Sequence, residues 1–244
     1  NFILNGIRMN PSSLSRTQII HKNVDASSLL SEIISAAKTG KYHLVERILV
    51  KPKLNILEEC LTKGTRTVIF INLIEGTLNP LTSWLKERNF NFNIYTGGNK
   101  EANDLGFKDS LDEFISGNTD VLVASIQCAG TGVDGLQSVC NKAIFFQLPW
   151  TSTEFEQSIG RLDRDGTEFK EIKIYLPLTY VNLPSGDTWS WCHSKLERIN
   201  SKKDIARAAV DGEIPDSQSI LNPKEASKLW LEWLKKLNLD NSQK

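Results

Sequence analysis

The 244-residue sequence has no GxxxxGK(S/T) segment, the glycine-rich loop whose backbone cradles the phosphates of a bound nucleotide. Gly40-Lys41 comes nearest to it, but Tyr42 stands where the loop needs Ser or Thr, and the first glycine is missing. Without this loop the β- and γ-phosphates have no cradle. We therefore expect the chain by itself neither to bind a nucleoside triphosphate tightly nor to hydrolyse one.

Apolar runs of membrane-spanning length and an N-terminal secretory signal are also missing. No two cysteines form a CxxC pair, so zinc ligation is disfavoured and free thiols in a reducing compartment fit best. The cysteines are Cys60, Cys128, Cys140 and Cys192. We expect an intracellular, cytoplasmic location in a prokaryote or virus in preference to a nuclear one.

Charge of one sign does not dominate, because 29 Lys and Arg residues balance 29 Asp and Glu residues. A nucleic-acid partner would therefore be met by a local basic patch and not by the field of the whole chain. Asp112-Glu113 resembles a magnesium-binding acidic pair, but it lies inside a helical pattern and not at the end of an apolar strand. The histidines share no ligand spacing, so we predict no metal site in this chain.

The stretch from Thr119 to Gly166 organises the rest of the chain. It contains two short apolar runs, 121–124 and 143–146, that are typical of buried strands in a parallel sheet. Between them the sequence at 129–135 is AGTGVDG, and glycines so placed let backbone N–H groups approach a ligand closely. This pattern predicts a ligand-facing loop; the alternative is a turn that needs only a flexible backbone.

A helix with two stripes is predicted over residues 152–163. The apolar stripe, which suits the core, consists of Phe155, Ile159 and Leu162. The polar stripe on the other side consists of Gln157, Arg161 and Arg164. Arginine suits planar, bidentate recognition of phosphate, so beside a glycine loop we favour a phosphate site. The alternative is a solvated charged face near a helix C-terminus, which favours cations.

Strand and helix patterns alternate through the middle of the chain. Further strands are predicted at 67–71, 90–95 and 172–176, and further helices at 53–61, 80–88 and 109–116. This βαβ series predicts an α/β fold with a parallel sheet and right-handed crossovers.

The two ends of the chain differ from this middle part. Residues 1–27 are predicted to be irregular or partly helical, and helices are expected at 28–40 and 42–49. Residues 177–187 are rich in turn formers, and helices follow at 190–209 and 222–237. The apolar face of the last helix would be either a packing anchor or a docking surface. We divide the chain into a helical lead-in (1–50), a central domain (51–180) and a mostly helical extension (181–244).

The central motifs carry a resemblance to a known family. Their order resembles motifs V and VI of superfamily-two helicases and translocases. The matching parts are the 121–124 strand, the Ala129-to-Asp134 segment, the 143–146 strand and the 156–166 run (EQSIGRLDRDG). The Pro149-Trp150 turn resembles the Swi/Snf-like branch, although Asp134 stands where that branch usually has Asn. The resemblance covers 51–176 and implies the C-terminal RecA-like lobe, a P-loop NTPase-like fold without the P-loop.

The resemblance implies a role for each motif residue. Arg161 and Arg164 would be arginine fingers that act on the γ-phosphate of ATP. The nucleotide would also be faced by Gln157, Gly130, Gly132 and Asp134. Backbone phosphates of a nucleic acid would be contacted by Thr96, Gly97, Ser125 and Thr131. The alternatives are a surface ion-pair face for the arginines and ordinary turns for the rest.

The resemblance also implies what lies outside this chain. ATP and Mg²⁺ would be held mainly by an upstream RecA-like lobe of the same polypeptide, and double-stranded DNA would be the track. Since the sequence begins with Asn1 and not Met, we expect a piece of a longer protein, monomeric and inactive alone. The rival hypothesis is a catalytically silent RecA-like module that binds nucleic acid or protein. A DEAD-like RNA helicase lobe and a restriction-enzyme motor are near variants.

Overall fold

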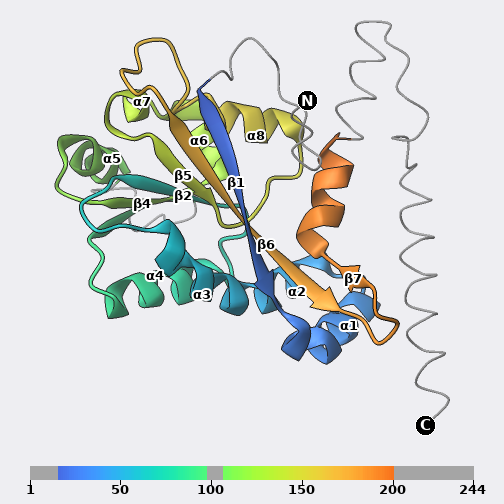
Figure 1. The fold of residues 1–244 in the computed structure, drawn as a ribbon. Helices are drawn as coiled ribbons and strands as arrows, with labels where there is room; N and C mark the ends of the chain where they lie inside the picture. The colour runs from blue at the N-terminus through green and yellow to red at the C-terminus, as the bar shows by residue number, and fades with distance from the viewer. Residues whose placement is uncertain (1–15, 98–106, 201–244) are drawn as a thin grey trace, which may run out of the picture.

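The computed structural model describes residues 16–97 and 107–200 (Figure 1). Its centre is a seven-stranded sheet in the order β1-β6-β5-β2-β4-β3, in which these neighbours all run parallel. The seventh strand pairs antiparallel with the end of β6. The strands are β1 (Thr17–Asp25), β2 (Thr67–Ile71), β3 (Phe92–Tyr95), β4 (Val121–Ser125), β5 (Lys142–Phe145), β6 (Ile172–Asn182) and β7 (Thr188–Trp189).

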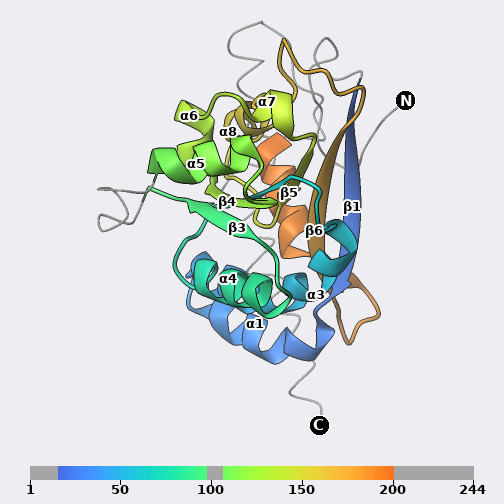
Figure 2. The same cartoon turned by 90° about the vertical axis from the view of Figure 1, so that its left-hand side faces the viewer.

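Helices cover both faces of the sheet, so the predicted α/β class is confirmed. One face is covered by α3 (Val50–Cys60) and α4 (Leu78–Glu87). The other is covered by α5 (Phe107–Ser116), α6 (Ile126–Gly132), α7 (Leu136–Val139) and α8 (Ser152–Ile159). Figure 2 shows these two helical layers below and above the strands. None of the described helices is long and apolar enough to cross a membrane.

The central strands are buried on both sides, which explains their continuous apolar sequence. In β2, Val68 and Phe70 contribute to the core beneath α5 to α8, whereas Ile69 and Ile71 contribute to the core beneath α3 and α4. All five residues of β2 and all five of β4 are buried. Parallel strands with this pattern place all their carboxyl ends at one edge of the sheet.

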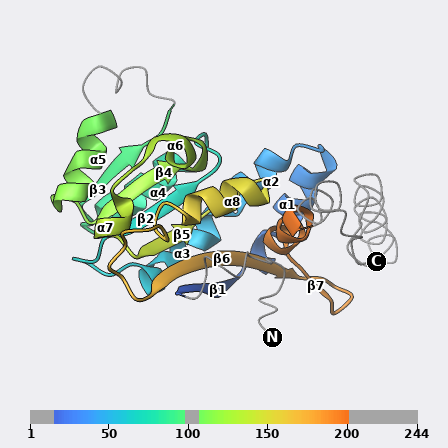
Figure 3. The same ribbon diagram turned by 90° about the horizontal axis from the view of Figure 1, so that it is seen from above.

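A third core joins the two ends of the described chain. Helices α1 (Leu30–Lys38) and α2 (Tyr42–Ile48), with the short 3-10 turn η1 (Ser27–Leu29) before them, pack with Val181 and Trp191. Trp191 belongs to a helix over residues 191–200 that lies beside α1 and α2 (Figure 3). The predicted helix starts at 28, 42 and 190 are thus close to the observed ones.

The prediction of an irregular or helical lead-in is wrong for residues 17–25. These residues form β1, a full member of the sheet, paired in parallel with β6 from Thr17↔Ile172 to Asp25↔Tyr180. The sequence signal is weak because β1 lies at the edge of the sheet, and of its nine residues only Ile19 is buried. The N-terminal extension is therefore a strand followed by helices, while the domain boundaries themselves stay predictions.

The prediction of turns from residue 177 is also wrong, because β6 continues to Asn182. The proline at 177 pointed to a strand end, since proline cannot donate to a ladder. It is tolerated because β5 pairs with β6 only as far as Tyr175. The Pro177 carbonyl instead faces the Cys192 thiol, 4.0 Å away. The rest of the predicted 190–209 helix and the 222–237 helix lie outside the described residues.

Candidate functional site

The carboxyl ends of the parallel strands β4 and β5 carry the residues singled out by the sequence. In open parallel sheets, ligands bind beyond this edge. Strand β4 leads directly into α6, and β5 leads through Trp150 into α8. Helices α6 and α8 pack against each other, so the two motifs meet in space.

The start of α8 is fixed by a capping box. The Glu154 backbone N–H donates to the Thr151 hydroxyl oxygen at 3.2 Å, and the Thr151 N–H donates to the Glu154 carboxylate at 3.2 Å. Phe155 is buried, with its ring 4.5 Å from the ring of Phe145. Gln157 lies on the exposed side of the same helix. The predicted division of α8 into a core face and an outward face therefore holds for its first turns.

The end of α8 differs from the prediction, because the helix stops at Ile159 and not at Asp163. Gly160 is the C-cap, a residue of low helix propensity. The chain then closes in tight turns, with the backbone N–H groups of Leu162 and Asp163 both donating to the Ile159 carbonyl at 2.9 Å. Consequently Arg161 lies in a turn after the helix, as does Arg164, and neither shares a helix stripe with Gln157.

This turn nevertheless directs both arginines toward the segment after α6. The Arg161 guanidinium donates through Nη1 to the Val133 carbonyl at 3.2 Å. The Arg164 Nη1 donates to the Asp134 carboxylate at 2.9 Å, and these side chains are 50% and 79% exposed. The structure therefore brings together Arg161, Arg164 and Asp134 at the surface.

The predicted glycine loop at 129–135 is mostly helical. Residues 126–132 form α6, and the Ser125 hydroxyl caps it by accepting from the Cys128 N–H at 3.3 Å. Gly130, Thr131 and Gly132 fall in the last turn of this helix. The glycines suggested a loop because they disfavour helix, but the cap and the burial of Ala129 compensate.

Glycine is required at Gly135, where φ is +92° and a side chain would meet Ile115 at 3.0 Å. Gly97 is also confined, because a Cβ there would lie 2.8 Å from the Cys128 sulfur. The end of β3 thus touches the start of α6. Gly97 is exposed, but its neighbour Thr96 is buried, so the Thr96 hydroxyl does not line the surface. Gly98 and Lys100, which follow Gly97 and would be expected near the same nucleic acid, lie outside the described residues.

Comparison with known proteins identifies the central part of the chain. Residues 52–166 match the family of the helicase conserved C-terminal domain. A Bacillus subtilis (strain 168) protein named uncharacterized ATP-dependent helicase YqhH is 34% identical over 108 residues. Residues 52–166 form a helicase C-terminal domain. The aligned part covers 44% of this chain but only 18% of the length of YqhH.

Two solved structures resemble the chain more distantly. The C-terminal part of the Fun30 ATPase domain is 19% identical, with a TM-score of 0.49 over 79% of this chain and 54% of that one. The E. coli DEAD-box protein SrmB, solved bound to the regulator RraA, is 17% identical, with a TM-score of 0.43 over 67% of this chain and 76% of that one. The helicase domain match ends at Gly166, so β1, β6 and the 191–200 helix lie outside it.

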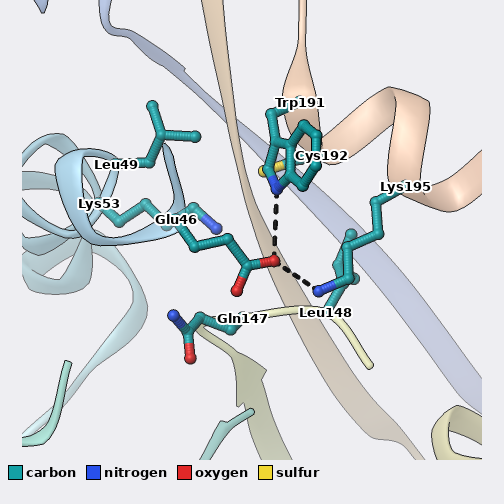
Figure 4. A pocket seen from close by; sticks show the side chains of 8 residues that line it. All are labelled: Glu46, Leu49, Lys53, Gln147, Leu148, Trp191, Cys192 and Lys195. Atoms are coloured by element: carbon teal, nitrogen blue, oxygen red, sulfur yellow. Dashed lines mark hydrogen bonds and ion pairs between the residues drawn. The ribbon is translucent and has the colours of Figure 1, made fainter. Parts of the chain in front are cut away.

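A buried pocket with several polar side chains lies between the helicase domain and the 191–200 helix (Figure 4). The sequence did not predict it. Lys195 Nζ lies 2.6 Å from Glu46 Oε1, and these side chains are only 3% and 5% exposed. The Trp191 Nε1–H donates to the same oxygen at 3.3 Å. Burial lowers the pKa of Lys195, and the Glu46 carboxylate opposes this shift.

Next to this pair, Gln147 ties the strand ends of the helicase domain together. Its side-chain oxygen accepts from the backbone N–H groups of Asn72 at 3.0 Å and Leu73 at 2.7 Å. Its amide donates to the Thr77 hydroxyl at 2.9 Å. Lys53 Nζ donates to the Phe146 carbonyl at 2.9 Å. These buried bonds fix the loops after β2 and β5, the edge from which α8 starts.

The described residues contain no cluster of carboxylates or other potential metal ligands. Within 16–97 and 107–200, no group of three or more His, Cys, Asp or Glu side chains could hold a metal ion. Asp112-Glu113 lies in α5, as the sequence predicted, and the Glu113 carboxylate accepts from the Asn93 amide at 2.6 Å. The described part of the helicase domain thus offers guanidinium groups for an anion and no cluster of ligands for a cation.

Proposed function

We propose that this chain is the second motor lobe of an ATP-dependent nucleic-acid helicase or translocase, of the Swi/Snf-like branch. The proposal extends the helicase domain match to a whole activity, with ATP delivered by an upstream lobe and double-stranded DNA as the track. Its main support is the convergence of Arg161 and Arg164 on the Val133–Asp134 segment at the surface. The name of the relative, an ATP-dependent helicase, points the same way.

Arg164 is suited to exchange its present partner for a phosphate. Its ion pair with Asp134 is exposed, and exposed pairs of this kind contribute about 0–1 kcal/mol. Two oxygens of a phosphate group can bind a guanidinium in the bidentate geometry that a carboxylate also allows, and the phosphate carries more charge. Displacement of Asp134 by a triphosphate would therefore cost little. On this account Asp134 holds Arg164 ready in the absence of nucleotide.

Arg161 is held more firmly than Arg164, which suits the group that must meet the reacting phosphoryl oxygens. It is partly buried and is anchored by the Val133 carbonyl. A fixed guanidinium stabilises charge in the transition state without reorganising, an effect of about 10³–10⁵ in rate for arginine fingers. ATP would supply the transferable phosphoryl group and Mg²⁺ would neutralise its oxygens, both held by the upstream lobe. Gln157, exposed on α8, would orient the nucleotide.

The proposed nucleic-acid track runs along the ends of β3 and β4. Backbone N–H groups there can contact phosphates without regard to base sequence. In this conformation Gly97 is exposed, while Thr96 is buried and Ser125 caps α6. Gly97 is therefore the first of the predicted contacts to test. Because a backbone N–H carries no charge, a substitution at Gly97 should weaken binding to different base sequences alike and leave its salt dependence nearly unchanged.

Nucleic-acid-stimulated ATP turnover in the full-length polypeptide tests the proposal. We expect Arg161→Ala to lower kcat by about 10³-fold or more without unfolding the protein. Circular dichroism and thermal unfolding of the variant serve as the folding control. Turnover like that of the wild type in a folded Arg161→Ala variant would contradict the proposal. A wild-type polypeptide that carries both lobes but lacks stimulated turnover would favour a silent binding module instead.

A further inference from the structure

Asp163 stands between Arg161 and Arg164 in the sequence, yet its side chain is directed to the first described residues of the chain. Arg16 Nε donates to Asp163 Oδ1 at 2.8 Å. The Thr17 hydroxyl donates to Asp163 Oδ2 at 2.6 Å. The Asp163 side chain is only 3% exposed, so this is a buried carboxylate with a separate donor for each oxygen.

The donors are themselves fixed to the sheet. Thr17 is the first residue of β1, which pairs with β6 over its whole length. The Arg16 carbonyl accepts from the Ile172 N–H at 2.9 Å, so the backbone on either side of the contact is hydrogen-bonded into the sheet. Asp163 therefore ties the turn that carries both arginines to a rigid element outside the helicase domain match.

We propose that Asp163, held by Arg16 and Thr17, is a positioning residue for the arginine turn. The inference rests on the proposed function of Arg161 and Arg164. Because Thr17 of β1 and Arg16 just before it supply partners for both carboxylate oxygens, Asp163 is drawn away from the guanidinium groups on either side of it. Arg161 is then directed to Val133 and Arg164 to Asp134, at the surface where a phosphate would arrive.

We call Asp163 with its partners Arg16 and Thr17 the clamp. The clamp sets the position of the arginine turn and touches no substrate. Its loss should therefore lower turnover more than nucleotide binding. A misplacement of about 1 Å at a reacting centre can cost roughly 10²-fold in rate. An interaction made only in the transition state lowers kcat with little change in KM. A merely structural ion pair would instead lower the unfolding temperature and leave kcat of the folded enzyme unchanged.

Three substitutions separate these outcomes in the full-length polypeptide. Thr17→Val keeps the β-branched shape of the strand residue and removes one donor. Arg16→Ala removes the other donor, and Arg16→Lys restores the charge without the planar guanidinium. We expect kcat to fall about 10-fold in Thr17→Val and 10- to 100-fold in Arg16→Ala, with KM for ATP changed less than about threefold. Arg16→Lys should recover part of the loss.

The matched control is Lys22→Ala on the same strand. Lys22 also makes an ion pair, with Glu59 at 2.9 Å, but on α3 and away from the arginine turn. Its loss should leave kcat within about twofold of the wild type. Turnover unchanged in folded Arg16→Ala, or an equal loss in Lys22→Ala, would overturn the inference.

A second measurement on the 244-residue chain needs no ATP turnover. In ¹⁵N NMR spectra the side-chain Nε–H signals of Arg161 and Arg164 should shift or broaden in Arg16→Ala and stay in place in Lys22→Ala. Unmoved signals in Arg16→Ala would refute the clamp even if the protein is a motor. Moved signals in a full-length protein whose Arg161→Ala variant turns over normally would support the clamp and refute the proposed function.

Discussion

Two of the ion pairs in the described part of the chain have similar lengths and opposite environments. Lys195 and Glu46 lie 2.6 Å apart and are almost completely buried, whereas Arg164 and Asp134 lie 2.9 Å apart at the surface. The buried pair joins two helices and is shielded by Trp150, whose ring centre lies 3.9 Å from Lys195 Nζ. The exposed pair joins two motifs and is open to solvent. Burial therefore separates a contact that holds the fold from one that, under the proposed function, a phosphate would replace.

Breaking the buried pair should have the largest effect on stability. Glu46→Gln keeps the shape of the side chain but leaves the Lys195 ammonium buried without a countercharge. Removing one partner of a buried pair costs about 3–5 kcal/mol. Urea unfolding should show a loss of this size in the free energy of unfolding. Glu59→Gln, at the exposed pair with Lys22, is the control and should cost less than about 1 kcal/mol. Equal losses in the two variants would contradict the comparison.

The next largest effect on stability is expected at alkaline pH, from the buried neutral thiol of Cys140. Burial raises the pKa of the Cys140 thiol from 9.0 to about 11. Between these values the unfolded chain has lost the proton and the folded chain still holds it, so stability falls as pH rises. Over the window the loss from this thiol is about 2–3 kcal/mol. Unfolding at pH 8 and pH 11 should therefore show a smaller pH-dependent loss in Cys140→Ala than in the wild type. A pH dependence unchanged by this substitution would mean that the thiol is not desolvated in solution.

The smallest effect is expected at the exposed pair. Asp134→Asn places at this position the residue that the Swi/Snf-like branch usually has. The free energy of unfolding should change by less than about 1 kcal/mol, and this small difference should shrink further in high salt. Chemical denaturation of both proteins at low and high ionic strength measures this difference in the free energy of unfolding. A loss comparable to that of Glu46→Gln would show that Asp134 is structural and not a partner that phosphate can displace.

The buried strands could be predicted from the sequence because a strand that is buried on both faces has a continuous run of apolar residues. The predicted 67–71 strand coincides with β2, and the predicted 121–124 run is β4 less one residue. Strand β1 could not be found in this way, because an edge strand with one buried residue has no such run. The extension of β6 past Pro177 was hidden because it depends on where β5 ends.

The site was predictable in its residue types and less so in its geometry. The spacing of the motifs predicted that the arginines and the 130–134 segment belong to one site. The helical period, however, did not predict that Arg161 and Arg164 lie in a turn after the helix. The buried pair was beyond sequence reasoning, because Glu46 and Lys195 are 149 residues apart and neither stands in a motif. The same holds for the Arg16–Asp163 contact, which spans 147 residues.

The central claim is that Arg161 and Arg164 meet a triphosphate delivered by another part of the polypeptide. A structure of the full-length protein with ADP and a fluoride mimic of the γ-phosphate tests it most directly. We predict a guanidinium nitrogen of Arg161 about 2.7–3.2 Å from the mimic, and Arg164 released from Asp134. A nucleotide bound with Arg164 still on Asp134, and Arg161 out of hydrogen-bonding reach, would contradict the account.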